Sequence, residues 1–377
     1  MSFGLAVPFG SVSAQEDPIK IAIAAPMTGN SAAFGQNAER GAEMAVEAIN
    51  AAGGINGRMI EYDIFDDRGV PREAASVANA IAAEADEYFA VLGHINSSAT
   101  LAGMPIYNEV GIPVINASSS NPTITEQGWE NFIRMTIRGD YGAQQYSAYA
   151  INNLGRKKLG IVFVNNDFGR ALRDDMMRAV EVLPAEVVAE AGFTPGVDKD
   201  FSAVITEFKN AGVDAVMLNT EYTEGGLFVG QAANLGLTDI AVVGPDTLLY
   251  DSFLDLSQGA AEGANILAAY DPYAENALTT SFMSSFQERY DTLPSQVAVF
   301  THDLFYLLKA AIEEEGATRD TLIDTIKGMN FQGAGGQYAW DEKGDVKDRT
   351  FAVIEVTGDG FKSTGLSVDE DGLEVLR

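Results

Sequence analysis

Cysteine is absent from the 377 residues, which excludes thiol catalysis, cysteine-bound metal sites and disulfide bonds. Histidine is scarce too: the chain has only His94 and His302, and neither has a neighbouring nucleophile to serve, so we expect structural roles for both. The sequence contains no Gly-x-Ser-x-Gly nucleophile elbow, no Gly-x-x-x-x-Gly-Lys-Ser/Thr phosphate loop and no His-Glu-x-x-His motif. The first predicted strand leads into Ala25-Pro26-Met27-Thr28-Gly29 instead of a dinucleotide-binding Gly-x-Gly-x-x-Gly. These absences argue against an enzyme and against a bound cofactor or metal.

Basic residues are few, with 24 Lys and Arg against 54 Asp and Glu and a formal net charge of −30. Such a surface repels phosphate backbones and anionic lipid, so we expect neither nucleic acid nor a membrane surface as a partner. After the N-terminal segment, no stretch approaches the roughly 18 uninterrupted apolar residues of a transmembrane helix. We therefore predict no direct membrane insertion.

The N-terminal segment, residues 1–14, is apolar and rich in small residues. It ends in Val12-Ser13-Ala14, which fits the small-x-small rule for signal-peptide cleavage, although no basic region precedes it. We interpret it as a signal-peptide remnant and expect an exported protein.

The length exceeds what one hydrophobic core usually organises, so two domains are expected. Buried strand patterns alternate with helical patterns in two series. The predicted strands are 19–24, 59–65, 88–92 and 112–115, then 159–164, 186–191, 215–219 and 240–243. The predicted helices among them lie near 38–52, 73–85, 143–154, 168–183, 201–211 and 224–235. This alternation predicts two lobes, each with a doubly wound parallel sheet.

The order changes after residue 268. Consecutive helices are predicted near 277–290, 296–315 and 318–328, followed by a hairpin of 337–340 with 350–356. These elements have no sheet of their own and must pack on an existing lobe. The chain is therefore expected to cross between the lobes through several short segments.

Two predicted strands end in hydroxyl-rich turns, residues 93–100 (GHINSSAT) and 116–122 (NASSSNP), and each turn leads into a helix. Such turns bring hydroxyls and helix N-terminal amides to one sheet edge, where they can hold a carboxylate without Arg or Lys. Serine is also a preferred N-cap, so helix capping remains the alternative for either turn taken alone. Two turns about twenty residues apart on neighbouring strands favour a ligand-binding cleft.

Short motifs occur in a fixed order from about residue 19 to residue 350. They begin with Pro26-Met27-Thr28-Gly29, Phe34-Gly35 and Gly53-Gly54-Ile55-Asn56-Gly57, continue with Asp66-Asp67, Gly93-His94, Phe168-Gly169 and Lys199-Asp200-Phe201, and end with Gly244-Pro245-Asp246 and Trp340-Asp341-Glu342-Lys343-Gly344-Asp345. Taken together in this order, they resemble the leucine/isoleucine/valine-binding protein family.

The resemblance implies a type I periplasmic binding protein, an α/β fold of two doubly wound parallel-sheet lobes joined by a three-segment hinge. Lobe 1 would comprise residues 15–137 and 268–347, and lobe 2 residues 138–267 and 348–377. Such a protein is a periplasmic receptor of an ABC importer, which captures a branched-chain, aliphatic or related amino acid between closing lobes and delivers it to a membrane permease. We expect a monomer.

The resemblance also implies a binding site. In this family, hydroxyls and amides of the first lobe hold the ligand carboxylate, and Ser97, Ser118 and Ser120 occupy those positions. An acid of the second lobe meets the ligand ammonium, and Asp246 stands where the family usually has Glu. The predicted ligand-binding residues are Phe34, Ile95, Asn96, Ser97, Ser118, Ser120, Phe168, Glu221, Tyr222 and Asp246.

Several positions depart from the family pattern. Phe34 and Phe168 take the two aromatic positions that cover the ligand, where Tyr is common. Glu221 matches a further ligand-contacting Tyr, but Tyr222 stands beside it, so either residue could face the cleft. If Glu221 does, two acids would surround the ammonium, and a larger or more basic ligand becomes plausible.

Asn96 and Gly69 stand where leucine-type members often have a disulfide-bonded cysteine pair. A polar Asn96 beside the side-chain pocket weakens the case for leucine specifically. A receptor for an amide or urea is the alternative within the same fold, and it would not need Asp246 as a counter-ion. A hydrolase or dehydrogenase is the alternative of another class, which the missing motifs disfavour.

Overall fold

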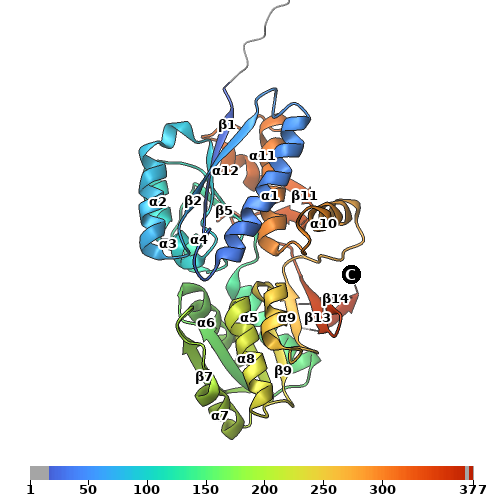
Figure 1. Ribbon diagram of the computed structural model, residues 1–377. Coiled ribbons are helices and arrows are strands. Elements are labelled where there is room, and N and C mark those ends of the chain that lie inside the picture. The colour runs from blue at the N-terminus through green and yellow to red at the C-terminus, as the bar shows by residue number, and fades with distance from the viewer. Residues whose placement is uncertain (1–16, 370–372, 377) are drawn as a thin grey trace, which may run out of the picture.

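Two α/β lobes, one above the other in Figure 1, make up the part of the chain that the computed structural model describes, residues 17–369 and 373–376. The predicted signal-peptide remnant lies outside these residues. Within them, no helix combines the length and apolar character needed to cross a bilayer.

Lobe 1 is built on a five-stranded parallel sheet in the order β2-β1-β3-β4-β5. Its strands are β1 (Ile19–Ala25), β2 (Ile60–Asp66), β3 (Ala90–Gly93), β4 (Val114–Asn116) and β5 (Phe132–Arg134). The helices from the first part of the chain are α1 (Ala32–Ala51), α2 (Pro71–Ala83), the short turn η1 (Ala85–Glu87), α3 (Ser97–Glu109) and α4 (Thr123–Glu126). The later part of the chain adds α10 (Ala277–Tyr290), α11 (Gln296–Glu313), α12 (Leu322–Lys327) and the hairpin β11 (Asn330–Gly333) with β12 (Gly336–Ala339).

Strand β1 shows why this sheet is covered on both faces. Successive side chains of a strand point to opposite faces, and Ile21 and Ile23 pack in the core beneath α1 and α11, while Ala22 and Ala24 pack in the core beneath α2 and α3. Both sets are buried, so the strand reads as a continuous apolar run. Helices α1 and α11 meet closely at Gly41, where a Cβ atom would lie 2.2 Å from the carbonyl oxygen of Ala298.

Lobe 2 is built on an eight-stranded sheet in the order β15-β14-β13-β10-β9-β8-β6-β7. Its parallel strands are β6 (Lys158–Val164), β7 (Glu186–Phe193), β8 (Ala215–Asn219), β9 (Ala241–Pro245) and β10 (Asn265–Ala268). Its helices are α5 (Gly139–Ala148), continued by the π-helical turn η2 (Tyr149–Asn153), then α6 (Asp167–Val180), α7 (Ser202–Ala211), α8 (Tyr222–Asn234), η3 (Asp246–Leu248) and α9 (Asp251–Ser257). The predicted doubly wound parallel arrangement is thus confirmed, and β13 (Phe351–Thr357), β14 (Gly360–Val368) and β15 (Glu374–Leu376) extend it as an antiparallel edge.

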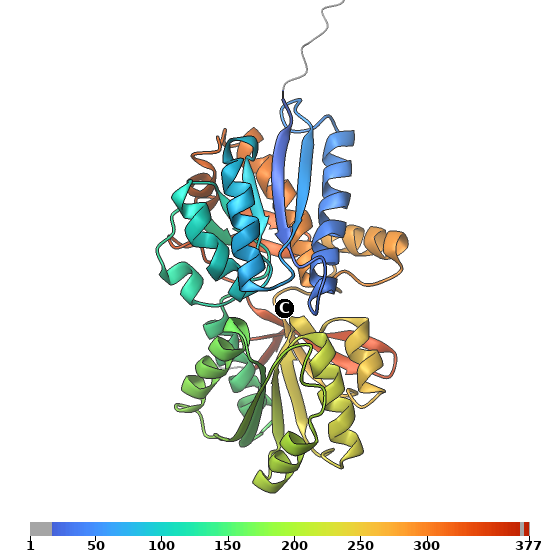
Figure 2. The same cartoon turned by 60° about the vertical axis from the view of Figure 1, so that its left-hand side comes forward.

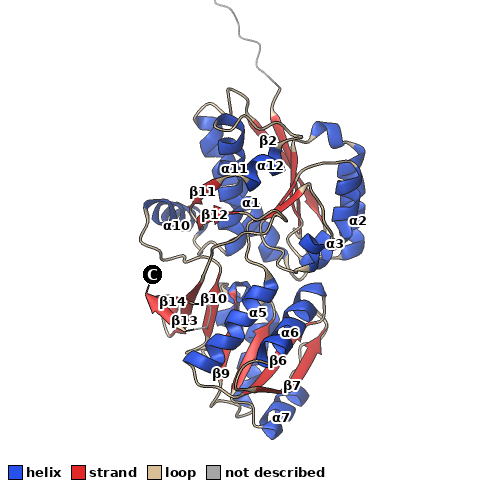
Figure 3. Cartoon of the chain, turned by 180° about the vertical axis from the view of Figure 1, so that it is seen from behind, coloured by secondary structure: helices blue, strands red, loops and turns tan. Residues whose placement is uncertain are grey.

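The predicted hairpin of 337–340 with 350–356 is wrong. Strand β12 pairs with β11 in lobe 1, whereas β13 pairs with β10 and β14 in lobe 2 (Figure 3). The turn between Trp340 and Val346 is closed by its own bridge and packs on lobe 1. Because Phe351 to Ile354 are all buried, they need a sheet with both faces covered, and the free edge of β10 supplies one.

The chain passes between the lobes three times, from β5 to α5, from β10 to α10 and from β12 to β13 (Figure 1). In Figure 2 the N-terminal end of α1 lies at the boundary between the lobes. Loops follow the C-terminal ends of β3 and β4 in lobe 1 and of β8 and β9 in lobe 2. These loops meet across the boundary, where Glu221 contacts Asn96 and Asp167 contacts Asn121. Ligands of open α/β sheets bind beyond such strand ends.

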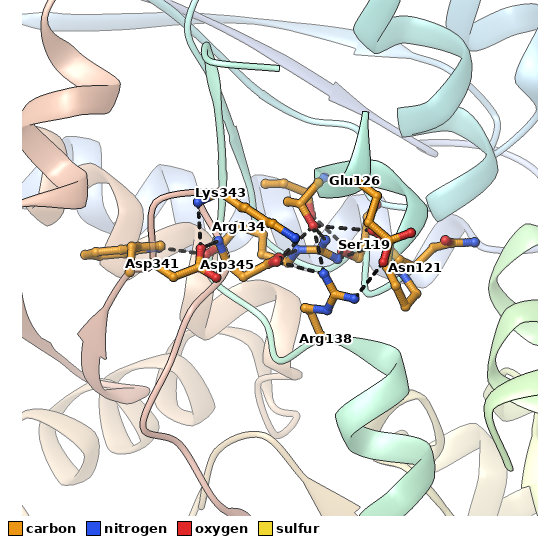
Figure 4. Close-up of polar contacts among 12 residues, drawn as sticks. Ser119, Asn121, Glu126, Arg134, Arg138, Asp341, Lys343 and Asp345 are labelled. Atoms are coloured by element: carbon orange, nitrogen blue, oxygen red, sulfur yellow. Dashed lines mark hydrogen bonds and ion pairs between the residues drawn. The ribbon is translucent and has the colours of Figure 1, made fainter. Parts of the chain in front are cut away.

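A buried arginine links the end of β5 to one of the serine-rich turns (Figure 4). Arg134 is fully buried, and its Nε lies 2.6 Å from Oδ1 of Asp345. Its Nη1 donates to the carbonyl oxygens of Ser119 and Asn121 at 2.9 and 3.1 Å, and its Nη2 donates to Thr125 Oγ1 at 2.7 Å. One guanidinium therefore holds the backbone of the turn that carries Ser118 and Ser120.

Asp345 joins this network to the segment that returns to lobe 2. Its Oδ2 accepts hydrogen bonds from Thr125 Oγ1 at 2.9 Å and from Arg138 Nη1 at 3.1 Å. Nearby, the indole of Trp340 donates to the carbonyl oxygen of Arg134 at 2.8 Å. Arg138 and Asp345 belong to two of the three interlobe connections, so the network ties the second serine-rich turn to the hinge.

We expect Arg134→Met to lower the free energy of unfolding by about 3–5 kcal/mol, because it leaves the carboxylate of Asp345 and two carbonyl oxygens buried without this donor. Urea denaturation at neutral pH measures the change. The matched control is Lys309→Met, which breaks a partly exposed helical ion pair with Glu313 and should cost about 0.5 kcal/mol or less. Equal losses in the two variants would contradict the role given to Arg134.

Candidate ligand-binding cleft

The two hydroxyl-rich turns lie side by side at the end of the lobe 1 sheet, as predicted, because β3 and β4 are neighbouring strands. Ser119 joins them: its Oγ donates toward the carbonyl oxygens of His94 and Ile95 at 3.1 and 3.0 Å. Asn116 shapes the second turn, since its Oδ1 accepts from the backbone N–H groups of Ser118 and Ser119 at 2.9 and 2.6 Å. Ser119 is therefore committed to the fold, and its two neighbours are not.

The other serines are held differently. Ser97 is buried at the start of α3, and its Oγ accepts from the backbone N–H of Asn121 at 3.3 Å. Ser118 and Ser120 are half-buried, and neither hydroxyl bonds to another residue in the described part of the chain. The N-caps of α3 and α4 are Asn96 and Pro122, without side-chain capping bonds, so helix capping does not account for these serines.

Asp246 follows β9 in lobe 2 and is only 8% exposed. Its carboxylate accepts from the backbone N–H of Ala269 at 3.0 Å. The side-chain amide of Gln296, from lobe 1, bridges Asp246 and Thr136: with Nε2 turned toward the carboxylate, it lies 2.9 and 3.0 Å from the two carboxylate oxygens, and Oε1 accepts from Thr136 Oγ1 at 2.6 Å. Burial raises the pKa of Asp246 to about 6, since no Lys or Arg among the described residues forms an ion pair with it.

A cavity of about 30 Å³ between the lobes brings four of the predicted residues together. The residues that line it include Ser118 and Ser120 from lobe 1, Thr136 from the first interlobe connection, Tyr146, Phe168 and Asp246 from lobe 2, and Gln296 from α11. Its volume is about that of one water molecule in the liquid, so entry of a larger solute requires the lobes to separate.

Phe168 reaches this cavity from the second position of α6. The preceding residue, Asp167, makes two interlobe hydrogen bonds: its N–H donates to Ser98 Oγ at 3.0 Å, and its carbonyl oxygen accepts from Asn121 Nδ2 at 2.7 Å. The end of α6 thus docks on both serine-rich turns, which sets the ring of Phe168 beside them.

Glu221 and Tyr222 both contact lobe 1. Glu221 Oε2 accepts from Ser31 Oγ at 2.8 Å, and Oε1 accepts from Asn96 Nδ2 at 3.3 Å. Tyr222 donates its hydroxyl to the carbonyl oxygen of Asn30 at 3.2 Å. Burial, which is the largest influence, raises the pKa of the Glu221 carboxyl to about 7.

The other six predicted residues do not line this cavity: Phe34, Ile95, Asn96, Ser97, Glu221 and Tyr222. Phe34 is buried against Tyr222 and Tyr250, with ring centroids 5.4 and 5.3 Å away. Ile95 packs in the core of lobe 1 and offers only its carbonyl oxygen, which Ser119 occupies. Asn96 lies beside Gly69, where a Cβ atom would be 3.0 Å from Asn96 Oδ1.

Sequence reasoning missed Gln296, Thr136 and Ser31. Gln296 opens a helix far along the chain and Thr136 lies in the first interlobe connection, so no local pattern marks either residue. Ser31 precedes α1 in the first strand-to-helix turn. Its place beyond the end of a parallel strand is the one feature of the sequence that could have marked it as a cleft residue.

Comparisons with known proteins agree with this arrangement. The family model of the periplasmic binding proteins matches residues 18–362. A leucine-, isoleucine-, valine-, threonine- and alanine-binding protein of Pseudomonas aeruginosa is 30% identical over 352 residues, which cover 92% of this chain and 92% of that protein.

Two solved structures share the fold at 27% identity and a TM-score of 0.84. One is a leucine-binding protein of Thermotoga maritima, with 92% of this chain and 97% of that chain covered. The other is a branched-chain amino acid transporter substrate-binding protein of Streptococcus pneumoniae in complex with isoleucine, with 92% and 99% covered. The family consists of solute-binding receptors, which confirms the prediction that the chain is not an enzyme. The chain belongs to the periplasmic binding protein family, where its relatives are leucine-, isoleucine- and valine-binding proteins.

Proposed function

We propose that this protein is exported to the periplasm, where it captures an α-amino acid between its two lobes and presents it to the permease of an ABC importer. One observation carries the proposal: Ser118 and Ser120 of lobe 1 and Asp246 of lobe 2 border the same cavity. Hydroxyl donors on one side and a carboxylate on the other are complementary to a zwitterion. The amino-acid ligands named for its relatives support the same reading.

The ligand carboxylate would lie against the serine-rich turns of lobe 1. Ser118 and Ser120 offer hydroxyls that are free of other described partners, and Ser97 adds a third nearby. Arg134 and Asn116 hold the turn backbone, so these donors are in place before the ligand arrives. Preorganised donors lower the ordering cost of binding.

The ligand ammonium would pair with Asp246, which forms no ion pair among the described residues. Arg349 acts on this carboxylate only at longer range. Gln296 of lobe 1 holds the same carboxylate only when the lobes are together, so it couples recognition to closure. Across the lobes, Asp167 also donates its N–H to Ser98 and accepts from Asn121, and these bonds hold the closed form in which the ligand would be buried. A ligand that contacts both lobes stabilises that form because it binds it more tightly.

We expect Asp246→Asn to weaken amino-acid binding by about 3–5 kcal/mol, because the ligand ammonium would be buried without a counter-charge. Titration calorimetry with leucine, isoleucine, valine and alanine measures the loss. Glu190→Gln, which removes a partly exposed acid on β7 of the same lobe, serves as the control and should bind as the unmodified protein does. Near-native affinity of Asp246→Asn for these amino acids would show that Asp246 is not the counter-ion of the ammonium. If the unmodified protein binds acetamide or urea and none of the amino acids, it is an amide or urea receptor.

The serines should separate into two groups. Ser120→Ala is expected to weaken binding by about 1–3 kcal/mol, the cost of losing one hydrogen bond to a charged group, with no change in the urea midpoint. The neighbouring variant Ser119→Ala should lower that midpoint, because its hydroxyl joins the two turns. If Ser120→Ala bound every amino acid normally, the turn would not hold the carboxylate.

Closure of the ligand-free protein should depend on pH through Glu221. In the closed arrangement, burial raises the pKa of the Glu221 carboxyl from 4.5 to about 7, so closing the lobes favours its protonated form. Protonation at low pH therefore stabilises the closed form, and this stabilisation is lost as the pH rises through 7. Lowering the pH from 8 to 6.5 should therefore reduce the radius of gyration measured by small-angle X-ray scattering. Glu221→Gln should be equally closed at both values, and Glu190→Gln should behave as the unmodified protein. A radius that does not change with pH in the unmodified protein would refute the effect.

A further inference from the structure

A second pair of acids lies at the boundary between the lobes. Glu221 is the N-cap of α8 and Glu224 stands in its first turn, and the two side chains are only 5% and 1% exposed. Neither forms an ion pair with any Lys or Arg among the described residues. The two charges also repel each other, which contributes to the raised pKa of Glu221. Buried carboxylates are normally paired, so this arrangement lacks a cation.

The hydrogen bonds around the pair leave acceptors without donors. Glu224 Oε1 accepts from the backbone N–H of Gly196 at 2.9 Å, whereas its Oε2 is buried with no partner. Asn96 donates to Glu221, and its own Oδ1 is likewise buried without a partner. These two acceptors come from different lobes, because Asn96 belongs to lobe 1 and Glu224 to lobe 2. A group with several N–H donors would satisfy them.

Aromatic rings border the same region. Tyr222, next to Glu221, lies with its ring centroid 4.6 Å from that of Tyr250 and 5.4 Å from that of Phe34. Aromatic faces attract ammonium and guanidinium groups, most strongly where water is excluded. The three rings thus add to the preference for a cation that the two acids create.

The N-terminus of α8 offers a simpler explanation, since its dipole favours nearby carboxylates. It accounts for acids at these positions, but it supplies no donor to Glu224 Oε2 or Asn96 Oδ1. A metal ion is also a poor match, because the described residues contain no group of three His, Cys, Asp or Glu side chains able to hold one. The hydroxyl and amide around the acids suit an organic cation with N–H donors.

One ligand can reach both acidic regions. Glu221 follows β8 and Asp246 follows β9, which are neighbouring parallel strands. The two loops touch, because Thr247 Oγ1 donates to the carbonyl oxygen of Thr220 at 2.6 Å. A solute whose α-ammonium meets Asp246 can therefore extend its side chain toward Glu221.

We propose that Glu221 and Glu224, with Asn96 and Ser31 of lobe 1, bind a cationic group at the far end of the ligand side chain. The favoured substrates are then basic amino acids, with a second ammonium or a guanidinium group, rather than branched aliphatic ones. This inference rests on the proposed function, since it assumes that the serine-rich turns and Asp246 hold the α-carboxylate and α-ammonium.

Titration calorimetry with L-lysine, L-arginine and L-norleucine tests the inference, because norleucine keeps an unbranched chain and lacks the terminal charge. We expect lysine or arginine to bind at least about tenfold more tightly than norleucine, as for a desolvated charge pair. Glu224→Gln and Glu221→Gln should each bring that ratio toward one, and the ratio cancels any effect of the variants on closure. Asp175→Asn, a buried acid of α6 paired with Arg178, is the matched control and should leave the ratio unchanged.

The outcomes separate the two proposals. The cationic subsite is overturned if norleucine or leucine binds as tightly as lysine and arginine and neither Glu variant alters the ratio of these affinities. Amino-acid capture would still stand in that case. The two acids would then serve only as contacts that close the lobes. Failure of all these amino acids to bind overturns the proposed function together with the subsite.

Discussion

The buried ion pair of Arg134 and Asp345 is the interaction on which the binding cleft depends. It joins the end of β5, the turn at Ser119 and Asn121, and the segment that leads back to lobe 2. Backbone hydrogen bonds from Arg134 to Gly344 and from Met135 to Asn116 join the same three parts. A guanidinium suits the position because its planar fork can hold carbonyl oxygens and a carboxylate at once. The serine hydroxyls are consequently presented by a rigid loop next to the hinge.

The two lobes contribute opposite chemistry to the cleft. Lobe 1 supplies neutral donors at the ends of β3 and β4, and lobe 2 supplies buried acids at the ends of β8 and β9. Neither set has its hydrogen-bond partners in its own lobe. The carboxylate of Asp246 accepts from Gln296, and that of Glu221 accepts from Ser31, only when the lobes meet. The acids remain costly to bury, as the raised pKa values of about 6 and 7 show. A cationic ligand removes that cost, so the same groups can favour an open receptor without ligand and a closed receptor with it.

The sequence predicted the parts of the cleft that follow from local pattern. Two hydroxyl-rich turns after apolar strands had to share a sheet edge, and Asp246 after β9 occupies the equivalent edge of lobe 2. The predicted hairpin of 337–340 with 350–356 was wrong because strand pairing is not a local property. Both segments are strands, but strands that follow one another in the chain do not always pair. Here β13 pairs with β10, which lies more than 80 residues earlier, and β12 pairs with β11.

The sequence by itself determined the α/β alternation, the serine-rich turns and the absence of enzymatic motifs, since each depends on residues that are close together in the chain. The role of Asp246 came only from the resemblance to the leucine/isoleucine/valine-binding protein family. Only the tertiary structure decided that Ser119 is structural while Ser118 and Ser120 border the cavity, that Gln296 reaches Asp246, and that Glu221 meets Ser31 and Asn96. Phe34 likewise resembled a ligand contact but packs on Tyr222 and Tyr250. The role of Ser119 depends on the pairing of β3 with β4, and the other outcomes depend on how the two sheets face each other. Both are set by long-range packing, which no local run of residues encodes.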